Sequence, residues 1–162
     1  MRKILLFFCA LAILSGNAIA ATTPNSAVRA QTPTEGRVQF LQGTDSAGTY
    51  KTLYTASANG TRCNGIWITN NDPSATHLVT CQIVNTAVKY GGAAITTVVS
   101  AGFTNANPAQ NLISPVVWTG LPNDSANNPY VQMVSGDTLQ CTFATALTAS
   151  DLINIVADCA DF

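Results

Sequence analysis

Four of the five cysteines carry the clearest chemistry in this sequence: Cys63, Cys81, Cys141 and Cys159. The fifth, Cys9, lies in an apolar run near the start. The even number that remains without it predicts two disulfides if the chain leaves the reducing cytosol. Four cysteines can pair in three ways. The spacing is 18 residues from Cys63 to Cys81 and again 18 residues from Cys141 to Cys159. Each spacing fits a hairpin with a central turn, which favours Cys63–Cys81 and Cys141–Cys159. A zinc site is the alternative, but the sequence has no C-x-x-C and a single histidine, so we expect no metal.

Catalytic patterns are scarce. His77 is the only histidine, and after a polar run we expect it at a strand edge, facing solvent. Neither a G-x-S-x-G nucleophile motif nor a phosphate-binding glycine loop is present. Asp158 and Asp161 could form the carboxylate pair of a glycosidase, but solvated acids at a strand end are the commoner arrangement. We therefore expect no enzymatic activity and no cofactor.

Two other groups of residues could bind ligands. Trp67, Trp118 and Tyr130 could stack on sugars if they lie together on one face, although the β-branched neighbours of both tryptophans favour the core. The Asn- and Asp-rich segment 123–128 offers oxygen ligands for calcium. Its spacing is not that of a calcium loop, and Asn and Asp are also common turn residues, so calcium binding stays open.

The first 20 residues have the features of a secretory signal. Arg2 and Lys3 precede an apolar run over 4–14, and Ala18-Ile19-Ala20 is typical of a cleavage site. The run is shorter than the roughly 20 residues that a membrane-spanning helix needs. We expect cleavage after Ala20 and a protein that is secreted, periplasmic or at the cell surface.

The charges that remain after cleavage exclude two classes of partner. The mature chain has few basic residues and an excess of acidic ones: Arg29, Arg37, Lys51, Arg62 and Lys89 against Glu35, Asp45, Asp72, Asp124, Asp137, Asp151, Asp158 and Asp161. Duplex and anionic-membrane binders present a basic face. We therefore expect no nucleic-acid partner, and no membrane insertion of the mature chain.

Short strands separated by turn residues fill the rest of the sequence. Roughly nine or ten strands are predicted, without a convincing helix: 38–42, 50–55, 66–69, 77–84, 88–90, 94–99, 116–118, 130–134, 138–143 and 152–158. This pattern favours an all-β, two-sheet sandwich resembling a jelly roll, with an up-and-down barrel as the alternative. We expect one domain over 37–162, preceded by a flexible arm over 21–36 that has too few apolar residues to pack on it.

Two segments resemble a known group of proteins. Residues 48–71 (GTYKTLYTASANGTRCNGIWITNN) and 121–139 (LPNDSANNPYVQMVSGDTL) are similar to recurrent segments of small β-rich proteins from the structural modules of tailed bacteriophages. The ending ADF is similar too. The resemblance implies a jelly-roll-like virion component, such as a decoration protein. The secretory signal and the cysteines differ from that group, which favours a related fold used outside the cytoplasm.

Two functions follow as hypotheses. The first is an exported, non-enzymatic structural subunit that associates with itself or decorates a larger surface or virion-like assembly. The second is a monomeric β-sandwich module that binds carbohydrate or another surface. The predicted partners are accordingly copies of this chain, other subunits of an assembly, or a glycan.

Overall fold

The computed structural model describes residues 32–72, 75–86, 88–97, 109–147 and 152–162. The predicted leader 1–20 lies outside these residues. Within them the chain is all β, with nine strands, which confirms the predicted fold class. The strands are β1 (Thr32–Leu41), β2 (Lys51–Thr55), β3 (Thr61–Asn70), β4 (Leu78–Asn85), β5 (Val88–Thr96), β6 (Gln110–Asn111), β7 (Val131–Met133), β8 (Asp137–Phe143) and β9 (Leu152–Asp161).

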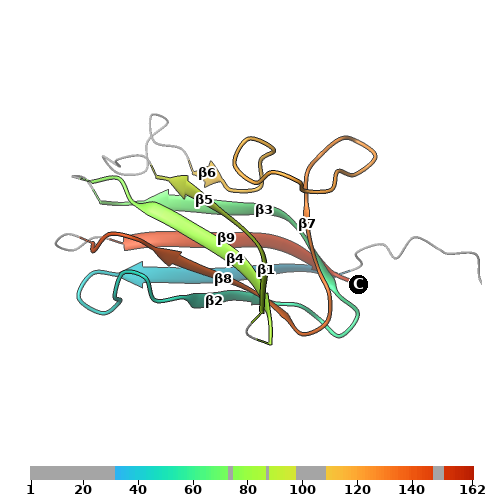
Figure 1. The fold of residues 1–162 in the computed structure, drawn as a ribbon, viewed down its shortest axis with the longest axis horizontal. Helices are drawn as coiled ribbons and strands as arrows, with labels where there is room; N and C mark the ends of the chain where they lie inside the picture. The colour runs from blue at the N-terminus through green and yellow to red at the C-terminus, as the bar shows by residue number, and fades with distance from the viewer. Residues whose placement is uncertain (1–31, 73–74, 87, 98–108, 148–151) are drawn as a thin grey trace, which may run out of the picture.

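The strands form two antiparallel sheets that lie face to face (Figure 1). Sheet A has the order β1-β9-β3-β6, with β7 also paired to β3, and sheet B has the order β2-β8-β4-β5. The first strand therefore pairs with the last, and the second with the last but one. This order is that of a jelly roll. The alternative of an up-and-down barrel is wrong, because β4 and β5 are the only consecutive strands among the nine that pair.

The core lies between the sheets and follows the alternation of the sequence. On β4, Val79, Cys81 and Ile83 are buried, and on β9 every second residue from Ile153 to Cys159 points inward. A bulge between Cys63 and Gly65 changes the alternation of β3, so that Cys63 and Ile66 both face the core. The rings of Phe40 and Phe143 meet edge to face at 5.1 Å, and they join the two sheets.

One edge of the sandwich is closed by a close approach of β1 and β2. A Cβ at Gly36 would lie 2.3 Å from the carbonyl oxygen of Leu53, so only glycine fits there. Nearby, the Lys51 ammonium donates to the carbonyl of Gln39 at 2.8 Å. The outer edge of β1 is therefore covered by β2 over these residues.

Three expectations about elements are wrong. The strands predicted over 88–90 and 94–99 are one strand, β5, which continues through Gly91 and Gly92 and ends at Thr96. β1 begins at Thr32, so residues 32–36 belong to the sheet and not to the flexible arm predicted over 21–36. They pair with 157–161 of β9, and these backbone hydrogen bonds compensate for their lack of apolar side chains. The rest of the arm lies outside the described residues.

Residues 116–118 form a turn instead of a strand, because the amides of Val117 and Trp118 both donate to the carbonyl of Ser114. No helix in the described part of the chain could span a membrane.

Candidate binding surfaces

The four cysteines form two disulfides, Cys63–Cys159 and Cys81–Cys141. The favoured pairing of Cys63 with Cys81 and of Cys141 with Cys159 is therefore wrong. β3 and β4 belong to opposite sheets, as do β8 and β9, so neither pair of consecutive strands is a hairpin. Each disulfide instead joins directly opposed residues of neighbouring strands within one sheet. All four cysteines are buried. Two disulfides indicate that the protein folds in an oxidising environment, extracellular or periplasmic.

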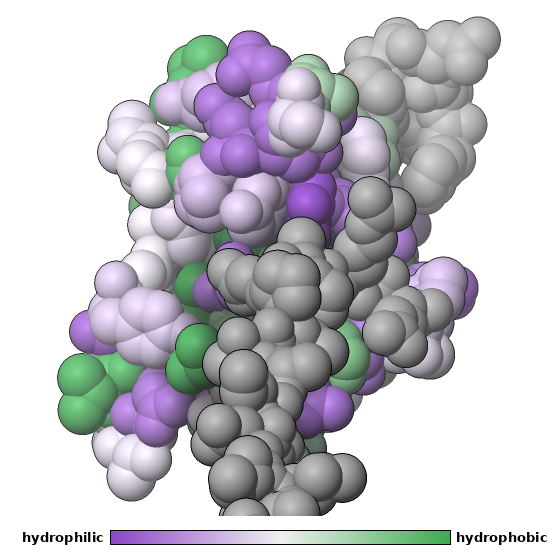
Figure 2. Space-filling view, turned by 90° about the vertical axis from the view of Figure 1, so that its right-hand side faces the viewer, coloured by the Kyte–Doolittle hydropathy of each residue, from purple (hydrophilic) through white to green (hydrophobic). Residues whose placement is uncertain are grey.

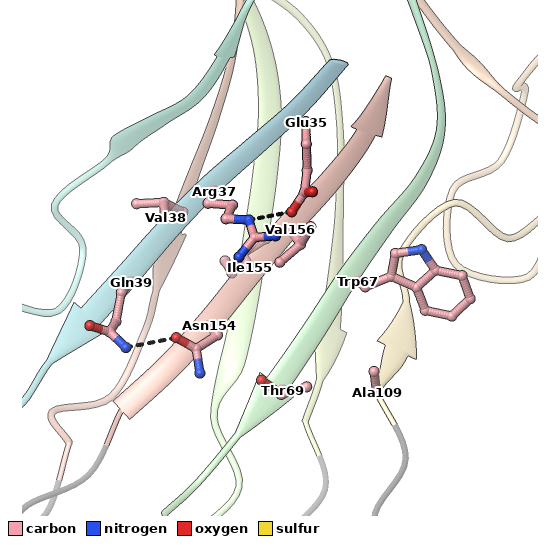
Figure 3. Close-up of a pocket in the computed structure, with 10 residues that line it drawn as sticks. All are labelled: Glu35, Arg37, Val38, Gln39, Trp67, Thr69, Ala109, Asn154, Ile155 and Val156. Atoms are coloured by element: carbon pink, nitrogen blue, oxygen red, sulfur yellow. Dashed lines mark hydrogen bonds and ion pairs between the residues drawn. The ribbon is translucent and has the colours of Figure 1, made fainter. Parts of the chain in front are cut away.

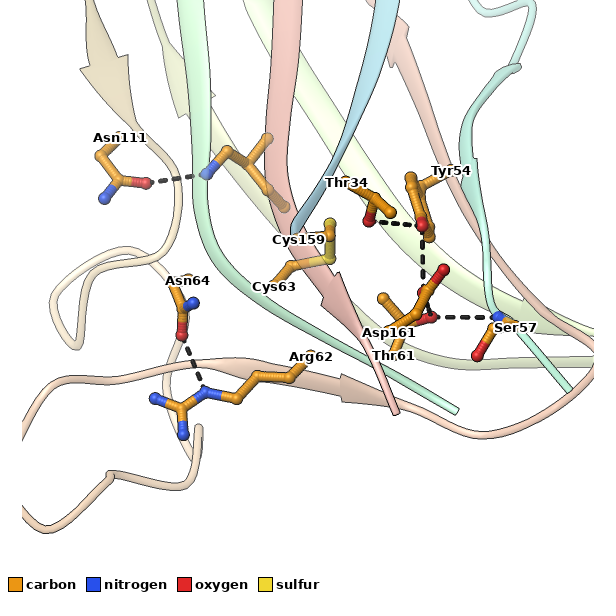
Figure 4. The surroundings of a disulfide bond; sticks show 11 residues. Thr34, Tyr54, Ser57, Thr61, Arg62, Cys63, Asn64, Asn111, Cys159 and Asp161 are labelled. Carbon is orange, nitrogen blue, oxygen red and sulfur yellow. Dashed lines mark hydrogen bonds between the residues drawn. A yellow bond between two sulfur atoms is a disulfide. The ribbon is translucent and has the colours of Figure 1, made fainter. Parts of the chain in front are cut away.

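A polar network beside Cys63–Cys159 fixes the end of the chain (Figure 4). The Thr61 hydroxyl donates to the Asp161 carboxylate at 2.6 Å, and Tyr54 Oη lies 3.0 Å from the same oxygen and 2.6 Å from Thr34 Oγ1. Burial raises the pKa of Tyr54, and the nearby Asp161 raises it further. This cluster joins β1, β2, β3 and β9. Asp161 thus joins β9 to its neighbouring strands, whereas Asp158 is exposed on β9.

The single histidine is fully buried, so the expectation of a solvent-facing His77 is wrong. Its Nε2 lies 2.8 Å from Oδ2 of Asp72, which is also buried, and its Nδ1 lies 3.1 Å from the carbonyl oxygen of Thr145. A carbonyl oxygen can only accept a hydrogen bond, so the ring donates from Nδ1 to Thr145. The pair joins the turn before β4 to the segment after β8. It is enclosed by protein and has a structural role.

The three aromatic residues considered for sugar stacking do not form one platform. Trp118 is 6% exposed and belongs to the core. Tyr130 is half-buried, and the Arg62 guanidinium covers its ring at 4.1 Å. Trp67 is 43% exposed on the outer face of sheet A. Of the three, Trp67 is therefore the residue that the fold leaves open to a ligand.

The loop 123–128 is organised around the Asp124 carboxylate. Its Oδ1 accepts the backbone N–H groups of Ala126 and Asn128, both at 2.9 Å, and its Oδ2 accepts Arg62 Nη2 at 2.9 Å. These bonds, led by that of Asn128, lower the pKa of Asp124. Hydrophilic surface gathers at this end of the molecule (Figure 2). Among the described residues, no group of His, Cys, Asp and Glu could hold a metal ion.

The outer face of sheet A has a hollow of about 790 Å³ across β1, β9 and β3 (Figure 3). The strand register arranges its side chains in rows. Trp67, Val156 and Arg37 form one row, and Thr69, Asn154 and Gln39 form the next. In Figure 3, Trp67 lies on one side of the hollow and Arg37 and Gln39 lie on the other, with β9 between them.

The outer face of sheet B has a different character. Threonine and glutamine predominate among its outward side chains, and the only charge among those described is Lys89 at the edge strand. Register places them in rows across the four strands: Leu78 and Thr96; Thr142, Thr80 and Ala94; Thr52, Gln140, Gln82 and Gly92; Thr55, Thr138, Val84 and Lys89. Of these, Thr142 is buried, with 6% of its surface exposed. Leu78 is exposed at the end of this face. Sequence reasoning missed both faces, because each is assembled from strands that are distant in the chain.

Comparisons with known proteins add little. No protein-family model matches the chain, and no curated protein matches its sequence. Among solved structures, a chain of the "Cyanophage Pam1 capsid asymmetric unit" is similar over 81% of this chain and 84% of that chain. The sequence identity is 14% and the TM-score is 0.42, a level at which the similarity carries no functional argument.

Proposed function

We propose that this protein is an exported, non-enzymatic structural subunit that associates with copies of itself through the outer face of sheet B. The observation that carries the proposal is the absence of charge from the described outward side chains of β2, β8 and β4. A two-fold contact brings each residue of a patch near the same patch of the partner. An uncharged patch can form such a contact without like-charge repulsion.

The side chains of this face suit a contact between two sheets. Threonine, alanine and glycine are small, and glutamine ends in a flat amide. Two such faces can therefore approach closely while the hydroxyl and amide groups keep hydrogen-bond partners. The outer face of sheet A is less suited, because Glu35, Arg37 and Asp158 place charges across it. The motif resemblance and the jelly-roll strand order agree with a subunit role, but neither names the assembly.

The size of the face predicts the strength of a single contact. Four strands about 4.8 Å apart and about 27 Å long cover roughly 500 Å², against about 800 Å² on each partner of a standard interface. One contact of this area predicts weak pairing. Repeated contacts in a larger assembly would strengthen it through effective concentration.

The experiment compares two threonine variants by light scattering after size exclusion, over a wide range of protein concentration. Thr80→Glu places a charge at the centre of the sheet B face, and Thr69→Glu is its matched control on the outer face of sheet A. We expect the mature protein and Thr69→Glu to associate with rising concentration. Thr80→Glu should associate at least tenfold more weakly, because two carboxylates would meet across the contact.

Two results would count against the proposal. A mature protein that stays monomeric at every concentration would remove self-association. Equal association of both glutamate variants would place the contact elsewhere. The thermal midpoints of the three proteins should agree within a few degrees, which would show that the added charge acts on association and not on folding.

A further inference from the structure

The hollow on the outer face of sheet A is independent of the proposed contact. Its lining combines one large aromatic side chain with several polar ones: Trp67 with Glu35, Arg37, Gln39, Thr69 and Asn154. Its volume, about 790 Å³, lies within the range of roughly 300–1,000 Å³ that is usual for ligand sites. Apart from Ala109, the lining residues belong to three strands that are paired by backbone hydrogen bonds.

The position of Trp67 depends on the glycine two residues before it. A Cβ on Gly65 would lie 2.5 Å from the indole Nε1, so the indole extends over the space that Gly65 leaves empty. The neighbouring Ile66 and Ile68 point into the core and fix the strand beneath the ring. The indole is therefore held against the sheet while 43% of Trp67 stays open to solvent.

The polar groups of the hollow select against charged ligands. Arg37 forms an ion pair with Glu35 on the same strand, so the two charges offset each other. Gln39 Nε2 donates to Asn154 Oδ1 at 2.8 Å, which leaves the remaining amide donor and acceptor groups open to a ligand. A phosphate or a nucleic acid would require unpaired positive charge. The available groups suit a neutral ligand rich in hydroxyls.

We propose that this hollow is a binding site for a neutral oligosaccharide, with a sugar ring stacked on Trp67 and the amides of Gln39 and Asn154 bonded to its hydroxyls. β1 and β3, which lie on either side of β9, are about 10 Å apart. A chain of two linked sugar rings can therefore reach from Trp67 across Val156 to Gln39. Val156 supplies an apolar floor between them.

The test is titration calorimetry of the mature protein with a set of neutral hexasaccharides: cellohexaose, xylohexaose, mannohexaose, maltohexaose, laminarihexaose and chitohexaose. We expect at least one to bind. Trp67→Ala should weaken that binding at least tenfold, and Trp67→Phe should restore part of it because a ring is kept. Tyr50→Ala is the matched control, since Tyr50 is a similarly exposed aromatic residue that does not line the hollow.

A second variant tests the site without removing the indole. Gly65→Ala should force the ring from its position, weaken binding severalfold and change the emission of Trp67, while the protein stays folded. Binding that survives Trp67→Ala would overturn the site, and so would failure of every hexasaccharide to bind at about 10 mM. Neither outcome bears on association through sheet B, which Thr80→Glu tests separately.

Discussion

Replacing both members of one disulfide by alanine opens one of two nested loops, and the loop lengths set the expected cost. Cys81–Cys141 closes a separation of 60 residues, and Cys63–Cys159 encloses it with a separation of 96. The chain-entropy relation gives about 4.3 kcal/mol for the inner loop alone. With the inner loop closed, the outer bond closes only the remaining 96 − 60 = 36 residues, for about 3.8 kcal/mol.

Loss of either pair should therefore lower the free energy of unfolding by between about 3 and 4 kcal/mol, and loss of both by about 8. Since domains of this size are stable by roughly 5–15 kcal/mol, either double variant should fold and the fourfold variant should be marginal. Urea unfolding of the oxidised mature proteins measures these differences. Two hairpin disulfides would give about 3 kcal/mol each, so stability alone does not separate the two pairings.

The number of free thiols does separate them. Cys63→Ala with Cys159→Ala should leave no free thiol, because Cys81 and Cys141 stay paired across β4 and β8. Cys63→Ala with Cys81→Ala should leave two, because Cys141 and Cys159 lie on opposite sheets. Alkylation in denaturant without reductant, followed by mass measurement, counts them. Two thiols in the first variant and none in the second would refute the disulfide assignment.

Three further predictions concern stability. His77→Ala removes the imidazole from the buried Asp72 carboxylate and should cost about 3–5 kcal/mol in urea unfolding; a loss below about 1 kcal/mol would contradict the buried pair. Because the folded pKa of Tyr54 is raised, its contribution to stability is complete below the unfolded pKa of about 10 and is lost as pH rises above that value. Tyr54→Phe should flatten this alkaline decline, and an unchanged pH profile would argue against it. Deleting residues 21–36 should lower the thermal midpoint more than deleting 21–31, because only the longer deletion removes the pairing of 32–36 with β9; equal midpoints would show that this pairing is dispensable.

Local patterns in the sequence were enough to predict the faces of the strands. The alternation in 79–83, 139–143 and 153–157 identifies core positions, and the structure buries Val79, Leu139 and Ile153 as expected. The choice of partner strand is not local, and this is why the cysteine pairing failed. Equal spacings of 18 fit two hairpins, but they also fit a chain folded back on itself. The nested separations, 96 and 60 residues, share a midpoint at position 111, but this follows from the equal spacings and does not choose between the two pairings.

In the candidate site too, local sequence patterns predict some features, and others depend on contacts between distant segments. Trp67 stands between Ile66 and Ile68, and alternation alone places it on the face opposite to these core residues. Sequence could therefore have separated Trp67 from Trp118, which is buried in a turn that brings it near Gly91 of β5. His77 could not have been placed in this way. Its burial depends on the Thr145 carbonyl, which is distant in the chain and is brought close only by the packing of the segments around it.

The most direct test of a contact through sheet B is a dilution series of the isotope-labelled mature protein followed by amide and methyl NMR. Association through the outer face of sheet B should shift the signals of Thr80, Gln82 and Gln140 as concentration rises. The signals of Arg37 and Val156, on the outer face of sheet A, should stay fixed. Spectra that do not change with concentration, or changes confined to sheet A, would contradict the proposed function.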